Sequence, residues 1–161
     1  MIEIETLTLE RKTDAPTGQT EKVCFVCTGN TCRSPMAEAA FNDLAHGRMT
    51  AVSRGLAVRE GDPVSRNALS ALKAKGIPTD GIEKHTAANI DEAILKQSAL
   101  ILCMTDRHAM SLLCQYPAFA SKIRTLGGEI PDPYGGDEET YLACLEAILS
   151  GLKATFPFLE S

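Results

Sequence analysis

The chain has 161 residues, of which 44% are hydrophobic, and a formal net charge of −5, so it can form one domain with its own apolar core. The acidic balance, with a pI near 5.2, argues against a nucleic-acid partner, whose binding surface is normally basic. No apolar run reaches the roughly 18–20 residues needed to cross a bilayer, and the acidic N-terminus does not resemble a signal peptide. We therefore expect a cytoplasmic protein without a membrane partner.

Six cysteines are spread over the chain, and without a secretory signal they do not indicate a disulfide framework. Cys24 and Cys27 have the spacing of a metal or redox pair. Both lie on a predicted strand, however, where an odd separation points side chains to opposite faces. No second pair of Cys or His residues has the spacing of zinc ligands. We therefore expect neither a metal site nor any other cofactor.

The first 21 residues differ in pattern from the rest of the chain. Aliphatic residues between positions 2 and 9 alternate imperfectly, which leaves a short edge strand open. Residues 14–21 have the composition of a linker. From residue 22 the apolar pattern becomes regular. We predict a loosely attached N-terminal extension over residues 1–21 and one domain over residues 22–161.

Strands and helices are predicted to alternate through this domain. Apolar runs predict strands over 23–27, 50–53, 99–104 and 123–126. The predicted helices begin at Pro35 with Ser34 as N-cap, at Asp62–Pro63, after Asn89 in a capping box with Glu92, before Ala109, and at about Glu138. Strands that alternate with helices indicate a single doubly wound α/β domain with a four-stranded parallel sheet and helices on both faces.

The segment between the first predicted strand and the first helix can wrap an oxyanion. Cys27 and Arg33 stand six positions apart, a spacing that is weak evidence by itself. Between them, Gly29 and Asn30 tolerate positive φ, which turns successive N–H groups toward one point and forms an anion nest. The N-terminus of the following helix adds partial positive charge. Arg33 supplies a planar fork for two phosphate oxygens.

The same surroundings activate the Cys27 thiol. Helix N-termini and arginines favour the thiolate, and Ser34 can donate a hydrogen bond to this sulfur. A thiolate at the end of a buried strand, facing a phosphate site, is poised to attack phosphorus. Asp132 lies in a second loop that also leaves a strand at its carboxyl end, where ligands bind in such folds. Pro131 and Pro133 stiffen that loop.

The residues from Cys27 to Pro35 resemble the phosphate loop of the low-molecular-weight protein phosphatase family, and Ile130–Tyr134 resembles its Asp-Pro general-acid loop. Ser53–Gly55 and Met104–His108 are also similar to family residues, so the likeness covers residues 22 to about 157. The resemblance implies that Cys27 forms a phosphocysteine, that Arg33 stabilises the phosphoryl group, and that Asp132 protonates the leaving group and later activates water. The phosphate-binding residues that it implies are Thr28, Gly29, Asn30, Thr31, Cys32, Arg33 and Ser34.

Two positions bear on the substrate. Thr31 stands where tyrosine-directed members usually carry an aliphatic residue, and in this the loop is similar to the bacterial protein arginine phosphatase branch. The hydroxyl of Thr31 and the carboxylate of Asp132 can satisfy a guanidinium, whereas an aliphatic wall favours a phenyl ring. Tyrosine-directed members often add a second aromatic after Tyr134, where this chain has Gly135. We therefore predict hydrolysis of phosphoarginine in proteins, with release of inorganic phosphate, and keep protein-tyrosine phosphatase as the alternative.

Two other functions compete with this one. A thiol-dependent arsenate reductase needs resolving cysteines, for which Cys103 and Cys114 have poor predicted geometry, since one lies on a strand and the other at the far end of a helix. A redox or oxyanion sensor would use Cys32, which is close enough on the loop to bridge to Cys27. We interpret such a bridge as regulation added to catalysis.

The three histidines, His46, His85 and His108, show no evident chemistry in the sequence and are interpreted as surface or packing residues. The expected partners are phosphorylated protein substrates. Nothing in the pattern requires a dimer, so we expect a monomer.

Overall fold

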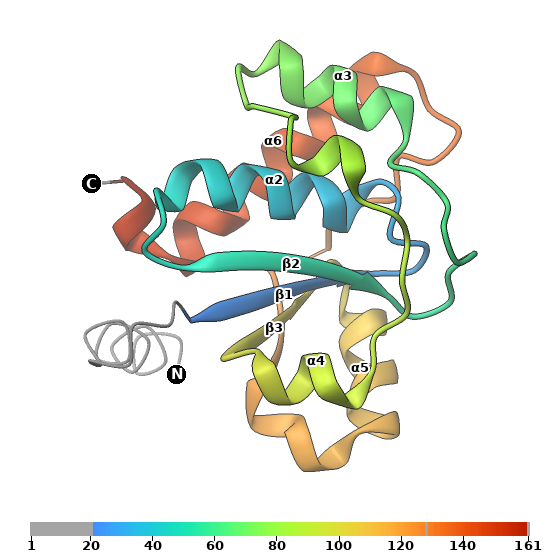
Figure 1. Cartoon of the computed structure of the whole chain (residues 1–161), viewed down its shortest axis with the longest axis vertical. Coiled ribbons are helices and arrows are strands. Elements are labelled where there is room, and N and C mark those ends of the chain that lie inside the picture. Colours follow the sequence, from blue (N-terminus) through green and yellow to red (C-terminus); the bar gives the residue numbers. More distant parts are fainter. Residues whose placement is uncertain (1–20, 128, 161) are drawn as a thin grey trace.

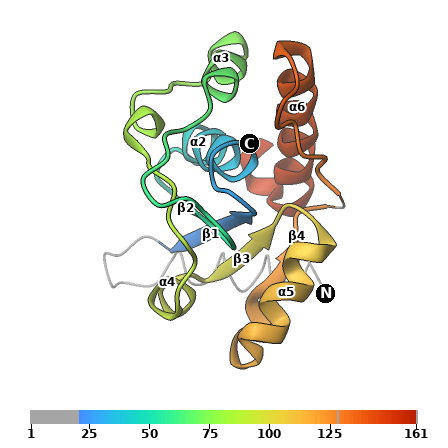
Figure 2. The ribbon, with the colours of Figure 1, turned by 90° about the vertical axis from the view of Figure 1, so that its right-hand side faces the viewer.

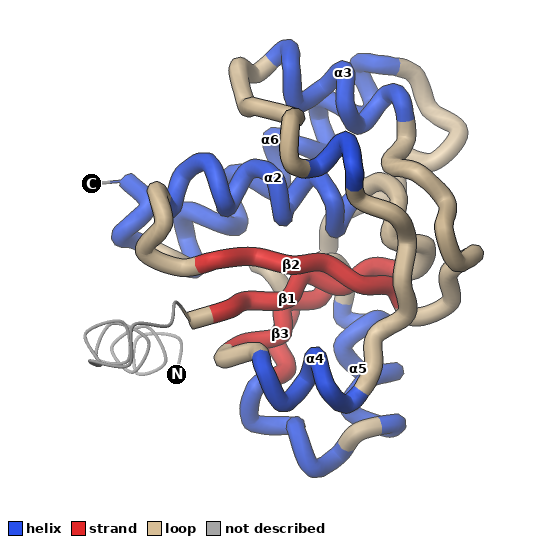
Figure 3. Tube along the Cα trace, in the orientation of Figure 1, coloured by secondary structure: helices blue, strands red, loops and turns tan. Residues whose placement is uncertain are grey.

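The structure, a computed structural model, describes residues 21–127 and 129–160. Apart from Glu21, the predicted extension and the edge strand considered within it lie outside the described residues. Four parallel strands form one sheet in the order β2-β1-β3-β4 (Figures 1 and 3). The strands are β1 (Lys22–Cys27), β2 (Thr50–Gly55), β3 (Leu100–Cys103) and β4 (Ile123–Thr125). The predicted four-stranded parallel sheet is therefore confirmed.

Helices cover both faces of this sheet, as predicted. On one face lie α2 (Arg33–Ala45), α3 (Arg66–Ala74) and α6 (Glu138–Thr155), and on the other lie α4 (Glu92–Gln97) and α5 (Asp106–Gln115) (Figures 1 and 2). Short 3-10 helices cover Ile82–Lys84 (η1), Pro117–Lys122 (η2) and Pro157–Glu160 (η3). In residues 21–127 and 129–160, no helix combines the length and the apolar character that a membrane span requires.

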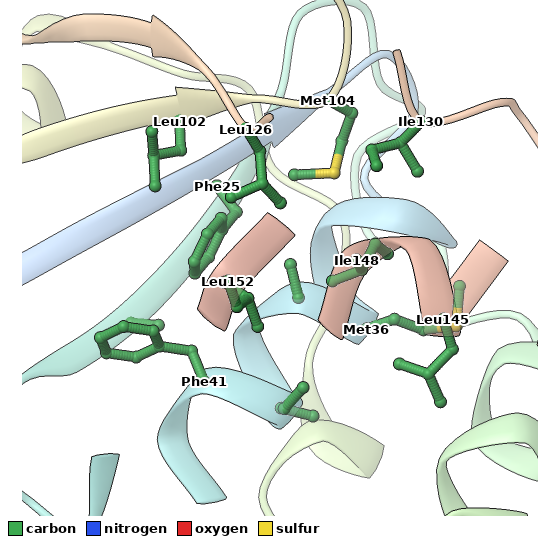
Figure 4. Close-up of a cluster of buried hydrophobic side chains, with 14 of the residues drawn as sticks. Phe25, Met36, Phe41, Leu102, Met104, Leu126, Ile130, Leu145, Ile148 and Leu152 are labelled. Atoms are coloured by element: carbon green, nitrogen blue, oxygen red, sulfur yellow. The ribbon is translucent and has the colours of Figure 1, made fainter. Parts of the chain in front are cut away.

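The side chains of β1 divide between two apolar clusters, because successive residues of a strand point to opposite faces. Phe25 and Cys27 belong to the larger cluster, under α2 and α6, whereas Cys24 and Val26 belong to the smaller cluster on the α5 side. The ring of Phe41, on α2, lies 5.9 Å from that of Phe25, and Figure 4 shows both in one cluster with the aliphatic side chains of α6. The strand that carries Cys27 is thus buried on both faces, and the prediction that Cys24 and Cys27 face opposite ways is confirmed.

The start of α2 differs from the sequence prediction. Cys32 is its N-cap, and Arg33 is its first residue, so Ser34 and Pro35 lie inside the first turn. A proline is tolerated there because the first N–H groups of a helix have no partner within it. The prediction of Ser34 as N-cap was therefore wrong, and its hydroxyl is left available for other partners.

Two further helices also begin later than predicted. Ser65, not Asp62–Pro63, caps α3, where its hydroxyl accepts the N–H of Ala68 (3.4 Å). Asp91, not Asn89, caps α4 and accepts the N–H three residues further on (2.9 Å). Each helix thus starts after the last polar side chain that can satisfy one of its free N–H groups, which leaves longer loops at the carboxyl edge of the sheet.

The loops that follow β1 and β4 meet at this carboxyl edge. After β4, the N–H of Leu126 donates to the carbonyl of Cys103 (2.9 Å), and the N–H of Ile130 donates to that of Met104 (2.9 Å). These bonds carry the chain across the end of β3 toward β1. The Asp132 loop therefore comes to lie beside the Cys27 loop.

Candidate active site

Cys27 is the last residue of β1 and is only 3% exposed. Its Sγ accepts a hydrogen bond from the N–H of Asn30 (3.3 Å) and lies 2.9 Å from the Oγ of Ser34. The sulfur thus has one backbone amide and one hydroxyl group as neighbours within hydrogen-bond distance. The contact predicted between Ser34 and the sulfur is present, although Ser34 does not cap the helix.

Asn30 fixes the turn of the loop. Its φ is 60°, whereas Gly29 has no positive φ, so only one of the two residues expected to tolerate that region adopts it. The Asn30 Nδ2 donates to the Oγ atoms of Ser34 (2.8 Å) and Ser53 (3.1 Å), and its Oδ1 accepts the N–H of Ala88 (3.1 Å). Because Asn30 is completely buried, removing its amide would take away a hydrogen-bond partner from Ser34, Ser53 and Ala88 together.

Behind Asn30, three polar side chains that were not predicted as site residues continue the network. Ser53 donates to Glu38 Oε1 (2.7 Å), and His85 Nε2 lies 3.0 Å from Asn30 Oδ1. Burial raises the pKa of Glu38 and lowers the pKa of His85. For Ser53 the sequence carried a signal in the family-like Ser53–Gly55 stretch, whereas no local pattern links His85 to a loop 55 residues away.

Arg33 joins the two loops at the carboxyl edge. It is the first residue of α2 and is 5% exposed. Its Nη1 donates to the carbonyl of Ile130 (3.0 Å), and its Nη2 lies 3.7 Å from Asp132 Oδ2. The Asp132 carboxylate is itself mostly exposed, and its Oδ1 accepts the N–H of Tyr134 (3.1 Å). Cys27, Arg33 and Asp132, predicted as a catalytic set, are thus brought together.

A cavity of about 280 Å³ opens over this loop. Every residue from Cys27 to Arg33 lines it, together with Asp132 and Tyr134. Ser34, also predicted to bind phosphate, does not line it and is completely buried behind the sulfur. Ala57, Arg59 and Asp62 form a wall that was not predicted, because only the pairing of β1 with β2 carries the segment after β2 to this edge.

His108 reaches the same loop from the other side of the sheet. It is 6% exposed, and its Nε2 lies 2.8 Å from the Oγ1 of Thr28. The interpretation of the histidines as surface or packing residues fits the exposed His46 but misses the contacts that His85 and His108 make with the loop. The sequence signal for His108 lay in the family-like Met104–His108 stretch.

Three cysteines outside the loop, Cys103, Cys114 and Cys144, do not line the cavity. Burial raises the pKa of Cys103 to about 12 and that of Cys144 to about 12, so both thiols are protonated at neutral pH. Cys103 lies in the cluster on the opposite face from Cys27, and Cys114 is exposed. This arrangement does not support the cysteine relay of an arsenate reductase.

Cys32 Sγ lies 3.3 Å from the hydroxyl of the buried Tyr141. All six cysteines are free, so the bridge from Cys32 to Cys27 stays a prediction. Among the described residues, no three His, Cys, Asp or Glu side chains are grouped as metal ligands would be.

Comparison with known proteins finds phosphatases of similar sequence. The profile of a family described as low molecular weight phosphotyrosine protein phosphatase matches residues 22–160. A protein-arginine-phosphatase of Bacillus subtilis is 33% identical over 129 residues, which are 74% of this chain and 83% of that protein. The low molecular weight protein-tyrosine-phosphatase PtpB of Staphylococcus haemolyticus is 37% identical over 134 residues, which are 80% of this chain and 92% of that one.

A solved structure extends the likeness to the fold. The crystal structure of a low molecular weight protein tyrosine phosphatase from T. tengcongensis has a TM-score of 0.78 and 39% sequence identity to this chain. The match covers 83% of this chain and 96% of that structure. Relatives of similar identity thus carry both the arginine and the tyrosine name.

Proposed function

Because the chain belongs to the low molecular weight phosphotyrosine protein phosphatase family, we propose that it hydrolyses phosphoarginine in proteins through a phosphocysteine intermediate on Cys27. Relatives named protein-arginine-phosphatase and protein-tyrosine-phosphatase identify the wider class, a cysteine-dependent phosphoprotein phosphatase. The observation that carries the choice of phosphoarginine is that Thr31, a residue with a hydroxyl group, lines the cavity.

The arrangement supports a reaction in two steps. The Cys27 thiolate attacks phosphorus, the bond from phosphorus to the substrate nitrogen breaks, and Asp132 gives its proton to that nitrogen. Water then attacks phosphorus, Asp132 takes a proton from the water, and the sulfur leaves as thiolate with release of inorganic phosphate. Arg33 and the loop N–H groups hold the phosphoryl oxygens through both steps. The 3.7 Å separation of Arg33 and Asp132 keeps the acid at the edge of the phosphate site.

Thr31 and two carboxylates suit a guanidinium group. Thr31, Asp62 and Asp132 all line the cavity, so a hydroxyl and two carboxylates can accept hydrogen bonds from the substrate. The N–H donors of a guanidinium need acceptors once they leave water. A phenyl ring would leave the same acceptors without partners. The polarity of this wall therefore favours phosphoarginine.

The wall that would hold a phenyl ring is incomplete. Tyr134 is 80% exposed. Gly135 has a φ of 82°, a conformation that residues with a side chain rarely adopt, so a second aromatic there would be strained. A Cβ at Gly136 would approach Thr140 Cγ2 to 2.7 Å. The backbone after Tyr134 thus disfavours the second aromatic that tyrosine-directed members often carry.

Matched peptides test the substrate. We would measure kcat/KM on peptides that carry phosphoarginine or phosphotyrosine at the same position, for the wild type, Thr31→Ile and Thr31→Ser. We expect the wild type to favour phosphoarginine and Thr31→Ile to move the ratio toward phosphotyrosine by about tenfold, the effect of one hydrogen bond to a charged group. Thr31→Ser keeps the hydroxyl and should keep the wild-type ratio.

The outcomes separate the candidate functions. A wild-type preference for phosphotyrosine that Thr31→Ile leaves unchanged would overturn the arginine assignment and leave a tyrosine phosphatase. Cys27→Ser should be inactive on both peptides, and an acid-quenched reaction of the wild type should contain a phosphocysteine detectable by mass spectrometry. Activity retained by Cys27→Ser would contradict the intermediate whichever peptide is preferred.

A further inference from the structure

Two threonines and one histidine link α5 to the Cys27 loop. His108 Nε2 lies 2.8 Å from Thr28 Oγ1, although the two residues are 80 positions apart. On the other side of the ring, Nδ1 lies 3.0 Å from Thr105 Oγ1. Thr105 caps α5, and its Oγ1 accepts the backbone N–H of His108 (3.1 Å). The ring is therefore held at both nitrogens by hydroxyl groups.

The bonding pattern assigns the direction of these hydrogen bonds. Thr105 Oγ1 accepts the backbone N–H of His108, and we assign its own hydroxyl proton to a hydrogen bond with Nδ1. A neutral ring whose Nδ1 accepts carries its proton on Nε2. The Nε2–H then donates to Thr28 Oγ1, and the hydroxyl proton of Thr28 must point elsewhere. This tautomer is assigned from the hydrogen-bond network.

Burial and the charges around the ring shift the pKa of His108. Burial lowers the pKa of His108, and the nearby guanidinium of Arg33 lowers it further, with a smaller contribution from Arg107. The carboxylates of Asp132 and Glu129 act in the opposite direction. Because burial and Arg33 outweigh the carboxylates, the ring is neutral at neutral pH, as the assigned tautomer requires.

The backbone of Thr28 is fixed independently of its side chain. Its carbonyl accepts the N–H groups of Leu56 (3.1 Å) and Ala57 (3.0 Å). Thr28 follows Cys27 directly, is exposed, and lines the cavity over the sulfur. With the backbone held and Oγ1 engaged by His108, the Thr28 hydroxyl proton can point into the cavity that Thr28 lines.

We propose that His108 is a positioning residue of this phosphatase, whose imidazole directs the Thr28 hydroxyl so that it donates a hydrogen bond to an oxygen of the bound phosphoryl group. The inference rests on the proposed use of the Cys27 loop as the phosphate site. It adds a side-chain donor from Thr28 to the donors of the loop backbone and Arg33. It also explains why a polar ring is buried beneath an exposed threonine.

Side-chain amides test the direction of the bond. The amide of glutamine reaches the place of Nε2, and the amide of asparagine reaches only the place of Nδ1. We would therefore compare His108→Gln and His108→Asn, with Thr28→Val, Thr28→Ser and the double variant Thr28→Val/His108→Asn. His46→Asn, at the exposed histidine after α2, is the matched control. The substrate is p-nitrophenyl phosphate, so the result does not depend on which peptide the enzyme prefers.

A positioning role predicts a specific pattern in kcat/KM. Thr28→Val and His108→Asn should each lose roughly tenfold, whereas His108→Gln and Thr28→Ser should stay within about threefold of the wild type. Adding His108→Asn to Thr28→Val should lower kcat/KM by less than about twofold relative to Thr28→Val alone, because both changes remove the same hydrogen bond. His46→Asn should match the wild type, and thermal melting should be alike for the two His108 variants.

Other results would overturn the inference. Equal losses in His108→Gln and His108→Asn would show that the ring only fills space. Losses in Thr28→Val and His108→Asn that multiply in the double variant would show independent effects, and wild-type activity in Thr28→Val would remove the hydroxyl from the reaction. Failure of the proposed function looks different, since the wild type would then be inactive or Cys27→Ser would remain active.

Discussion

Asn30 shapes the Cys27 loop through both its backbone conformation and the hydrogen bonds of its side chain. Its φ of 60° turns the chain, a conformation that asparagine tolerates better than most residues. Its amide also joins Ser34, Ser53 and His85. A glycine would allow the same turn, as Gly29 was expected to do, but would leave those partners unsatisfied. The loop is therefore held in shape before any phosphate binds.

Asp132→Asn tests the proposed proton donor. Asparagine keeps an oxygen that can accept the N–H of Tyr134 but supplies no acidic proton. We expect kcat on a phosphoarginine or phosphotyrosine peptide to fall by roughly 10²–10³-fold, the usual contribution of a general acid. On p-nitrophenyl phosphate, whose leaving group departs without a proton, the first step should be much less affected. The rate of the first step is measured from the initial burst of product. An equal loss of this rate on both substrates would contradict the role of Asp132 as proton donor.

Residues close together in sequence were predictable, and of the residues joined to them only by the sheet, Asp132 was placed at the site whereas His85 and His108 were not. Cys27 and Arg33 belong to one short segment, and the strand before them and the helix after them could be recognised from apolar periodicity. His85 and His108 contact that segment only because the chain returns past the carboxyl ends of neighbouring strands. Ser34 shows the limit of local rules, since its hydroxyl contacts Cys27 in preference to capping α2.

At the scale of elements, the packing of α6 against the end of β4 positions the acid loop. Gly151 of α6 lies against the chain just after β4, where a Cβ would meet the carbonyl oxygen of Leu126 at 2.9 Å and its Cγ at 3.1 Å. Leu126 in turn is bonded to Cys103 at the end of β3. The glycine lets the helix approach the segment that leads to Asp132. Apolar periodicity predicted the helix, but such a close approach has no signal in the sequence of α6.

Gly151→Ala should therefore destabilise the protein. Alanine in a helix interior normally stabilises by about 0.5–1 kcal/mol relative to glycine, whereas forcing a methyl group against fixed backbone costs about 1–3 kcal/mol. We expect a net loss of roughly 1 kcal/mol in the free energy of unfolding, measured by urea denaturation. Ser150→Ala, at the exposed neighbouring position, serves as control and should be neutral or slightly stabilising. An increase in the free energy of unfolding for Gly151→Ala would show that α6 can shift away from Leu126 and accommodate the methyl group.

At the scale of the whole molecule, two apolar clusters enclose a sheet whose carboxyl edge holds the polar site. The fold class was predictable because strand runs and helical stripes alternate regularly from residue 22. The starts of α3 and α4 were wrong by a few residues because several polar side chains in succession could serve as cap. The unpredicted cavity wall around Arg59 and Asp62 depends on the pairing of whole strands.

Buried histidines make global stability depend on pH. Burial lowers the pKa of His108 and of His85 below the ordinary value of 6.5, so in the window just below 6.5 the unfolded chain binds more protons than the folded one. Stability is therefore lost as pH falls below about 6.5. The raised pKa of Glu38 has the opposite sign, because there the folded state binds more protons.

Two variants separate these contributions. Urea unfolding between about pH 7 and pH 5.5 should show a smaller loss of stability in His108→Gln than in the wild type, and a larger loss in Glu38→Gln. The comparison uses the slope of the free energy of unfolding against pH, so a lower stability of either variant at neutral pH does not affect it. Parallel curves for all three proteins would contradict the assigned directions.

The position of β1 has a consequence for how the molecule opens. Cys27 ends a strand that is bonded to β2 and to β3 and buried on both faces, so exposing it to solvent exchange requires nearly global unfolding. Asp132 lies on an exposed loop, and its side chain is held through Arg33 and the N–H of Tyr134. We therefore expect the proposed nucleophile, Cys27, to lie in the part of the fold that opens last, and the proposed proton donor, Asp132, in one of the parts that open first. Movement of the Asp132 loop would therefore allow substrate entry and product release without moving Cys27.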